Sequence, residues 1–326
     1  MEFFFKKLSA VSATVILLIL ASIFVVLFIY AKPAIKEYGL HFLIEKRWGV
    51  TVKLDNTTNI DTKKTISPQE VLDNGIILSE DEDGIIIDDE DDEETNSHTK
   101  VIYGGLIPIV GTILSTILAM FFAVPIAMGI AIFLSEIASP LIHKPVGIAI
   151  ELLAAIPSII YGMWGLFYFG PFIASIFGGA SVSLLVAGMV LAIMIIPFMA
   201  SLTRDSMNTT PDVLKESAYA IGATKFEVIK DIIFPYAKSG IIGSMILALG
   251  RALGETMAVA FVIGGVFKLP EKLTDPTVSI PVVLANSFPE SSGMSLHVLF
   301  YLALILFVIS FFVISFAKFY FLKNKV

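Results

Sequence analysis

The sequence predicts an all-α membrane protein with six transmembrane helices. Hydrophobic residues make up 56% of the 326 residues, and the mean hydropathy is +0.87. A soluble domain of this size cannot bury so much apolar surface. In addition, uncharged stretches recur that reach the length of about 20 residues needed to cross the hydrocarbon. The expected helices cover, approximately, residues 8–31, 106–134, 147–169, 181–202, 238–266 and 296–318.

The ends of these helices follow from lengths and local breakers. The apolar run 8–31 has 24 residues, whereas the core of a signal peptide has about 7–15, so we expect a retained helix. The 52 uncharged residues of 152–203 must hold two crossings, and we expect the break at Gly170-Pro171 and Gly178-Gly179. Pro125, Pro157 and Pro197 fall within the second, third and fourth helices. They predict kinks and are hinge candidates, and static kinks are an equal alternative.

The short loops set the orientation, because Lys and Arg gather in loops on the cytoplasmic side. With six crossings, both termini are expected to be cytoplasmic. The basic residues on that side are Lys6, Lys7, Lys144, Arg204, Lys215, Lys225, Lys230, Lys318, Lys323 and Lys325. We expect Glu151, Arg204 and Asp205, at cytoplasmic helix ends, to be interfacial anchors rather than pathway residues.

Four regions follow: an N-terminal helix (1–31), an extracytoplasmic loop (32–100), a transmembrane domain (101–318) and a cytoplasmic tail (319–326). Within the loop, residues 71–94 hold twelve acids and no Lys or Arg, which predicts a solvated acidic segment, with a small hairpin at its paired Ile runs. Residues 79–90 approach a calcium loop, but Ser79 replaces its first Asp and Ile87 occupies its ninth position. Without cysteines or suitably spaced histidines, no metal site is expected.

The loop at 203–236, called the coupling loop below, predicts two short helices. Thr210 is a good N-cap, Pro211 suits the first helical position, and Gly222 suits a left-handed C-cap. Thr224-x-x-Glu227 is a capping box that starts the second helix, and Pro235 ends or kinks it. The loop has few bases and is tethered at both ends in the membrane, so nucleic acid is not an expected partner.

The spacing inside this loop resembles the EAA signature of ABC importer permeases. The matching residues are Glu216-Ser217-Ala218, then Gly222 after three residues, and Ile232-x-Phe234-Pro235 after nine more. Ser217 stands where the signature has Ala, and Phe234 where it has Leu. The resemblance implies that the first short helix docks on an ATPase subunit.

Further stretches resemble the PstC-type phosphate permeases: YGLHFL (38–43), PIVGTILSTILAMFFAVPIAMGIAIFLSE (108–136), ELLAAIPSIIYGMWGL (151–166) and GRALGETMAVAFVIGG (250–265). The resemblance implies a MetI-like core of helices 2–6 with an added first helix, in a bacterial or archaeal inner membrane. It also implies a homologous PstA-type permease, an ATPase dimer that holds ATP and magnesium, and an extracytoplasmic phosphate-binding protein. The chain lacks a G-x4-G-K-[ST] loop, so it is not itself the ATPase and needs no cofactor of its own.

Arg251 and Glu255 are the expected substrate-pathway residues. Arg251 lies 13 residues after Lys238 and 17 before Lys268, which places it about 20 Å from either end of a continuous helix. An uncompensated Arg there costs about 2.5–3.5 kcal/mol, so we expect it to face a polar cavity or a subunit interface.

Gly243, Gly250 and Gly254 form a small-residue stripe that predicts close helix packing beside the pair. We interpret Arg251 as a contact for phosphate and Glu255 as the acid that positions it and prevents overly tight anion binding. The alternative is a structural ion pair one turn apart. For the whole chain, the alternatives are a permease for another oxyanion, such as molybdate or sulfate, and a passive channel or scaffold.

Overall fold

The computed structural model describes residues 2–53 and 99–322. The acidic segment 71–94, with its hairpin and calcium-loop interpretations, lies outside the described residues, as do positions 323–326 of the tail. Within the described part, six helices are long and apolar enough to cross a membrane, which confirms the expected number. They are Lys6–Leu43, Leu106–Ile137, Ser158–Phe177, Leu184–Asn208, Lys225–Leu253 and Gly293–Tyr320.

Several spans are built from shorter helices. The helices are α1 (Glu2–Tyr38), α3 (Leu106–Ile132), α4 (Pro140–Ala154), α5 (Ser158–Trp164), α6 (Gly170–Phe177), α7 (Leu184–Asn208), α8 (Asp212–Ala220), α9 (Lys225–Glu227), α10 (Phe234–Leu253), α11 (Met257–Ala260), α12 (Ile280–Ser287) and α13 (Gly293–Leu322). π-helical turns at Phe133–Ile137, Gly165–Phe169 and Val228–Ile233 extend or join them, and 3-10 turns lie at Gly39–Leu43 and Phe288–Glu290.

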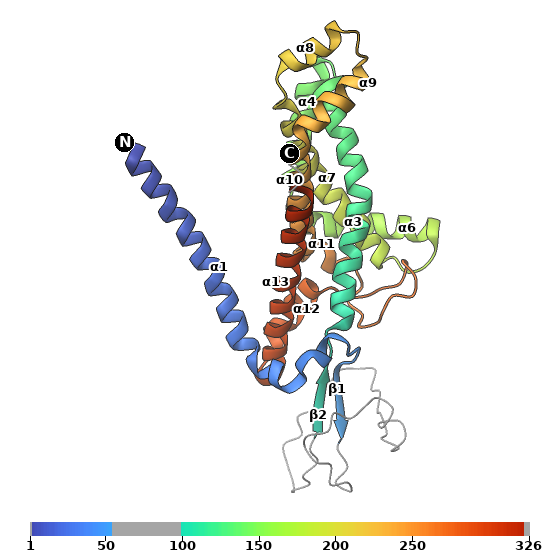
Figure 1. Cartoon of the computed structure of the whole chain (residues 1–326). Coiled ribbons are helices and arrows are strands. Elements are labelled where there is room, and N and C mark those ends of the chain that lie inside the picture. Colours follow the sequence, from blue (N-terminus) through green and yellow to red (C-terminus); the bar gives the residue numbers. More distant parts are fainter. Residues whose placement is uncertain (1, 54–98, 323–326) are drawn as a thin grey trace.

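Helix α7 is the centre of the bundle and packs against α3 and α10 (Figure 1). The side of α3 that is fully buried carries an alanine every fourth residue: Ala119, Ala123, Ala127 and Ala131. Gly188 of α7 lies so close to α3 that an added Cβ would come within 2.6 Å of Leu118. Small residues at helical spacing therefore allow the close approach of these two membrane helices.

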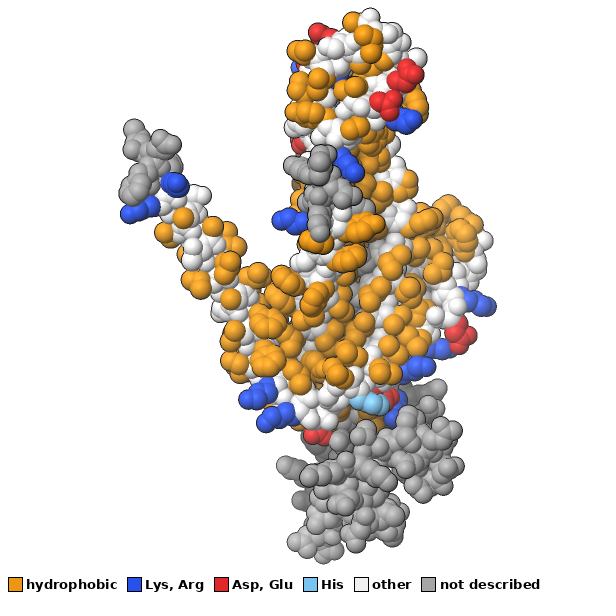
Figure 2. Space-filling view, viewed as in Figure 1, with side chains coloured by type: hydrophobic (Ala, Val, Ile, Leu, Met, Phe, Trp, Pro, Cys, Tyr) orange, Lys and Arg blue, Asp and Glu red, His pale blue; other side chains and the backbone are white. Residues whose placement is uncertain are grey.

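The second half of helix α1 packs against α13, whereas its N-terminal half leans away from the bundle (Figure 1). The rings of Tyr30 and Phe300 stack with centroids 4.8 Å apart, and Phe24 packs on Phe307 at 5.8 Å. The imidazole Nδ1 of His297 lies 2.8 Å from the Tyr30 carbonyl. Figure 2 shows apolar side chains covering the middle of the molecule, including the visible part of α1, as a lipid-facing surface requires.

A two-stranded ribbon, which the sequence did not predict, lies at the end of the molecule opposite α8 (Figure 1). Strand β1 (Trp48–Lys53) pairs antiparallel with β2 (Thr99–Tyr103), with Trp48 opposite Tyr103 and Lys53 opposite Thr99. The Tyr38 hydroxyl donates to the Val101 carbonyl at 2.9 Å, and Trp48 stacks on Phe267 at 4.9 Å. These contacts fix the ribbon to the helical body.

The third predicted helix (147–169) is wrong at both ends. Helix α4 ends at Ala154, outside the membrane span, and the span begins at Ser158, directly after Pro157. Pro157 has no N–H and disfavours helical geometry at the residue before it, so the chain breaks there. The predicted break at Gly170-Pro171 does not form, because the helix continues through it as α6. The real end is Gly178-Gly179, where both residues have positive φ values of 71° and 88°.

The fifth predicted helix (238–266) is also wrong, because α10 ends at Leu253. Residues 254–256, called the helix break below, separate α10 from the single turn α11. Beyond α11 the chain forms a loop whose carbonyls accept from the start of α7: the N–H of Ser183 donates to Val262 O, that of Leu184 to Asp275 O, and that of Leu185 to Leu273 O. These bonds satisfy the first N–H groups of α7, which have no partner within the helix.

Candidate functional site

Arg251 lies in the last turn of α10, directly before the helix break, and is exposed on the surface of the chain. The predicted place in the middle of a continuous helix is wrong, because α10 ends at Leu253. Its Cζ lies 5.7 Å from the centre of the Phe198 ring on α7, which is within the range of a cation–π contact. Among the described residues, no carboxylate pairs with the guanidinium and no acceptor receives a hydrogen bond from it. Its N–H donors are therefore free to meet a group from outside this chain.

Glu255 lies in the helix break and is half-buried. Its Oε1 accepts a hydrogen bond of 3.2 Å from the N–H of Ala258 at the start of α11. The alternative of an Arg251–Glu255 ion pair one turn apart on a single helix is wrong, because α10 ends between the two residues. Within the described residues no ion pair joins them. The pathway role of Glu255 stays a prediction.

Helix α5 supports the break from the side. A Cβ added to Gly162 would lie 3.0 Å from the Cα of Ala258, so α5 packs directly on the backbone of α11. Tyr161 donates its hydroxyl to the Leu153 carbonyl at 2.8 Å, which bridges the gap between α4 and α5. The first turns of the third span thus lie against α11, the turn that follows the end of the fifth span.

The glycine stripe of α10 packs less than predicted. Gly250 approaches α13, where an added Cβ would lie 3.1 Å from Ile314. A Cβ added to Gly243 would meet no atom within 4 Å, and one added to Gly254 would meet only the Gly250 carbonyl oxygen, at 3.8 Å. The stripe is therefore not a tight seam inside this chain, and the part around Gly243 is left for lipid or another subunit.

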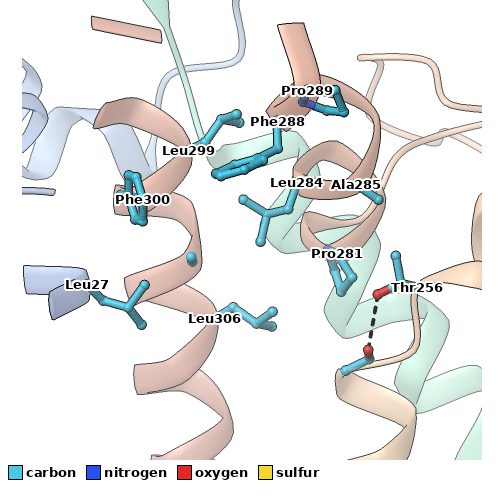
Figure 3. A pocket seen from close by; sticks show the side chains of 12 residues that line it. Leu27, Thr256, Pro281, Leu284, Ala285, Phe288, Pro289, Leu299, Phe300 and Leu306 are labelled. Carbon is cyan, nitrogen blue, oxygen red and sulfur yellow. Dashed lines mark hydrogen bonds between the residues drawn. The ribbon is translucent and has the colours of Figure 1, made fainter. Parts of the chain in front are cut away.

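A cavity of about 460 Å³ borders the other side of the helix break (Figure 3). Its lining comes from α1, α12, the 3-10 turn after α12, α13 and the break, and none of its residues is charged. The residues are Leu27, Gly254, Thr256, Pro281, Leu284, Ala285, Phe288, Pro289, Leu299, Phe300, Ala303 and Leu306. The Thr256 hydroxyl, the main polar group there, donates to the Gly254 carbonyl at 3.4 Å. This apolar cavity is unsuited to an anion and is distinct from the surface that carries Arg251.

The coupling loop forms the two predicted short helices, α8 and α9, at the end of the molecule opposite the ribbon (Figure 1). Gly222 has φ +94°, and the bonds Gly222 N–H to Tyr219 O and Ala223 N–H to Ala218 O make a Schellman motif. The capping box of Thr224 and Glu227 is present in both directions. Both stop and start signals are confirmed.

Two details of the loop differ from prediction. The N-cap of α8 is Pro211 rather than Thr210, whose buried hydroxyl finds no hydrogen-bond partner among the described residues. Pro235 does not end a helix, because the π-helical turn Val228–Ile233 precedes it and places it in the first turn of α10. The span therefore runs on through Pro235, whose missing N–H falls where the π-helical turn passes into α10.

The residues of the EAA signature lie on and beside α8. Glu216 and Ser217 are exposed, whereas Ala218 is buried in a small core with Met207, Val228 and Ile233. Lys215 pairs with Glu136 at 2.9 Å, which ties α8 to the end of the α3 span. Large apolar side chains at this end remain exposed: Val213, Leu214, Tyr219, Ile221 and Phe226. Such a patch on a loop outside the membrane is typical of a protein–protein interface.

The predicted anchor residues form one cluster between α4 and α7. The buried Arg204 donates to Glu151 at 3.1 Å and to Asp205 at 2.9 Å. Gly147 of α4 leaves space for the guanidinium, since an added Cβ would lie 2.8 Å from Nη1. Of the hinge candidates, Pro125 and Pro197 lie inside α3 and α7, while Pro157 marks a break between helices. Whether any of them bends during transport stays a prediction.

Known proteins are similar to this chain in sequence and in fold. The family model of the binding-protein-dependent transport system inner membrane component matches residues 101–326. The phosphate transport system permease protein PstC of Pasteurella multocida is 50% identical over 236 residues, which cover 66% of this chain and 74% of the relative. PstC of Haemophilus influenzae is 40% identical over 329 residues, covering 95% and 89%.

Solved structures agree at the level of the fold. An inward-facing MetNI methionine ABC transporter gives a TM-score of 0.53 at 18% identity, covering 64% of this chain and 90% of the other. A bacterial ABC transporter involved in the import of the acidic polysaccharide alginate gives 0.54 at 15% identity, covering 68% and 80%. The MetI-like core expected for helices 2–6 is therefore confirmed.

The chain belongs to the family of binding-protein-dependent transport inner membrane components, in its PstC-type branch. It is a multi-pass inner-membrane permease subunit and not an enzyme, and ATP hydrolysis belongs to a separate subunit. A substrate-binding protein and an ATPase are the partners that the family implies.

Proposed function

We propose that this chain is the permease subunit of an ATP-driven phosphate importer and that Arg251 contacts phosphate during translocation. The names of its relatives support the substrate. The observation on which the site depends is the exposed Arg251, which lies within a membrane span and has no carboxylate partner among the described residues.

An unpaired charge inside the membrane is unfavourable in lipid, so the guanidinium requires a polar surrounding in the assembled transporter. A homologous PstA-type permease, placed against the open face of α10, supplies the second wall of the pathway. The planar guanidinium donates several hydrogen bonds in one plane, which suits the oxygens of a tetrahedral oxyanion. The half-buried carboxylate of Glu255 lies four residues on and limits the positive potential, so that phosphate is released.

The coupling loop transmits the motion of the ATPase. Helix α8, with Glu216 and Ser217 exposed and the apolar patch around it, docks on the ATPase subunit that binds ATP and magnesium. Both termini lie on that cytoplasmic side, as the loop charges indicate, and the ribbon end faces the extracytoplasmic phosphate-binding protein. Closure of the ATPase dimer then changes the side of the membrane from which Arg251 is accessible.

Uptake of labelled phosphate by the assembled transporter tests the proposal. Arg251→Ala is expected to abolish uptake, while the complex still purifies with its ATPase at the normal yield. Arg251→Lys, which keeps the charge but loses the planar donor set, is expected to retain part of the activity. Normal uptake by Arg251→Ala would remove this residue from the pathway.

The two rival functions predict different results. A permease for sulfate or molybdate predicts that these anions compete efficiently with labelled phosphate, whereas a phosphate importer predicts little competition. A passive channel or scaffold predicts uptake that does not depend on ATP and a purified complex without a nucleotide-binding subunit.

A further inference from the structure

Phe198 is the one aromatic side chain of α7 that lies against the Arg251 guanidinium, with its ring centre 5.7 Å from Cζ. We propose that Phe198 is a positioning residue, whose ring holds Arg251 in place for the anion without neutralising it. This inference rests on the proposed function of Arg251 as a phosphate contact.

The chemistry of the ring suits this task. A carboxylate partner would cancel the charge of the guanidinium and occupy the N–H donors that an anion needs. The face of an aromatic ring attracts a cation through its quadrupole and leaves those donors open at the edge of the guanidinium plane. The nearest acid in sequence, Glu255, instead uses Oε1 to accept from the Ala258 N–H.

The placement of the ring supports the same conclusion. Helix α7 is the most deeply buried of the six spans, and Phe198 lies between the buried residues Pro197 and Met199. Arg251 lies on the last turn of α10, next to a break, and its side chain is long and flexible. A rigid ring on the central helix therefore restricts a mobile cation, and a site ordered in advance binds its ligand at a lower entropic cost.

A fluorination series at position 198 tests the inference in the complete transporter. Phenylalanine with one, two and three ring fluorines is incorporated at this position, and phosphate uptake is normalised to the amount of purified complex. Fluorine withdraws electrons from the ring face and changes its shape little. We expect uptake to fall with each added fluorine, by about 3- to 30-fold across the series.

The matched control is the same series at Phe122 of α3, a half-buried ring that packs edge-on against Phe121 at 5.3 Å. Uptake is expected to stay level there. Phe198→Trp, which keeps an aromatic face, should retain more activity than Phe198→Leu. A purely packing role for Phe198 predicts a level series at position 198 as well, and that result would overturn the inference.

Arg251→Ala, measured in the same preparation, separates the two possible failures. If Arg251→Ala is inactive and the series at 198 is level, the positioning role is wrong and the proposed function stands. If Arg251→Ala transports normally, the proposed function itself is wrong, and the positioning role of Phe198 is overturned with it.

Discussion

Arg251 benefits from its place at the carboxyl end of α10, where unpaired carbonyl groups carry partial negative charge. A cation in the last turn of a helix gains about 0.3–1 kcal/mol. An Arg at the centre of a membrane helix costs about 2.5–3.5 kcal/mol, which is more than this gain, and the last-turn position of Arg251 lies away from that centre. The helix end and the Phe198 ring therefore reduce the cost without removing it, and a passing anion or a neighbouring subunit must supply the rest.

Glu255 has two separable functions at the residue scale, because its carboxylate bonds the Ala258 N–H and also carries charge near the guanidinium. Glu255→Gln keeps an acceptor for that N–H and removes the charge. We expect this variant to assemble normally and to transport more slowly, because phosphate leaves the more positive site less readily. Uptake rate and the melting temperature of the purified complex measure the two effects.

Glu255→Ala is the control, since it removes both functions and should lower the melting temperature as well. Should Glu255→Gln transport like the unchanged protein while Glu255→Ala fails, the carboxylate would serve only to start α11.

Gly222 shows how one element depends on a single backbone conformation. Its φ of +94° is accessible to glycine, and a β-branched residue is strongly disfavoured there. Gly222→Val should distort the Schellman motif and shift α8 relative to α9. We expect ATP hydrolysis to continue while phosphate uptake falls, which an assay of phosphate moved per ATP hydrolysed would detect.

Gly222→Asn is the matched variant, because Asn tolerates the left-handed region better than most residues. It should retain most of the coupling. If Gly222→Val moves as much phosphate per ATP as the unchanged protein, the turn between α8 and α9 does not transmit the motion.

At the scale of elements, local signals predicted well and long-range arrangements did not. The caps at Gly222 and Thr224 are local hydrogen-bond chemistry, and hydropathy alone indicated six spans. The breaks after Ala154 and Leu253 lie inside apolar stretches, where hydropathy has no signal. Pro157 marks the first of these breaks. However, Pro125 and Pro197 lie within continuous helices, so a proline alone does not identify a break.

The site was predicted in part for the same reason. A charge in an apolar run was enough to single out Arg251. Its neighbour Phe198 lies 53 positions earlier in the chain, and only the packing of α7 against α10 brings them together. The strands β1 and β2 are likewise separated by 45 residues, and no local sequence pattern predicts that they pair.

The whole molecule places its two outer surfaces at opposite ends, with the coupling loop at one and the ribbon at the other (Figure 1). Trp48, Tyr38 and Phe267 fix the base of the ribbon to the helical body. Deletion of residues 71–94 leaves both strands intact. Because this segment is strongly acidic and has few apolar side chains, it contributes little to a core. We therefore expect phosphate uptake to remain largely unchanged in the deletion, measured beside the full-length transporter.

The deletion also tests the ribbon end as a docking surface. If the phosphate-binding protein no longer binds the transporter that lacks residues 71–94, the acidic segment has a role in docking. The expectation of unchanged uptake is then wrong.

The role of Arg251 is tested most directly by an experimental structure of the complete transporter, with its partner permease and ATPase, captured while phosphate is inside the membrane domain. If Arg251 contacts phosphate, the anion lies within about 3 Å of the guanidinium nitrogens, with the Phe198 ring against the guanidinium face. A phosphate bound elsewhere, with Arg251 against lipid or paired with a carboxylate of the partner throughout the transport cycle, would contradict it.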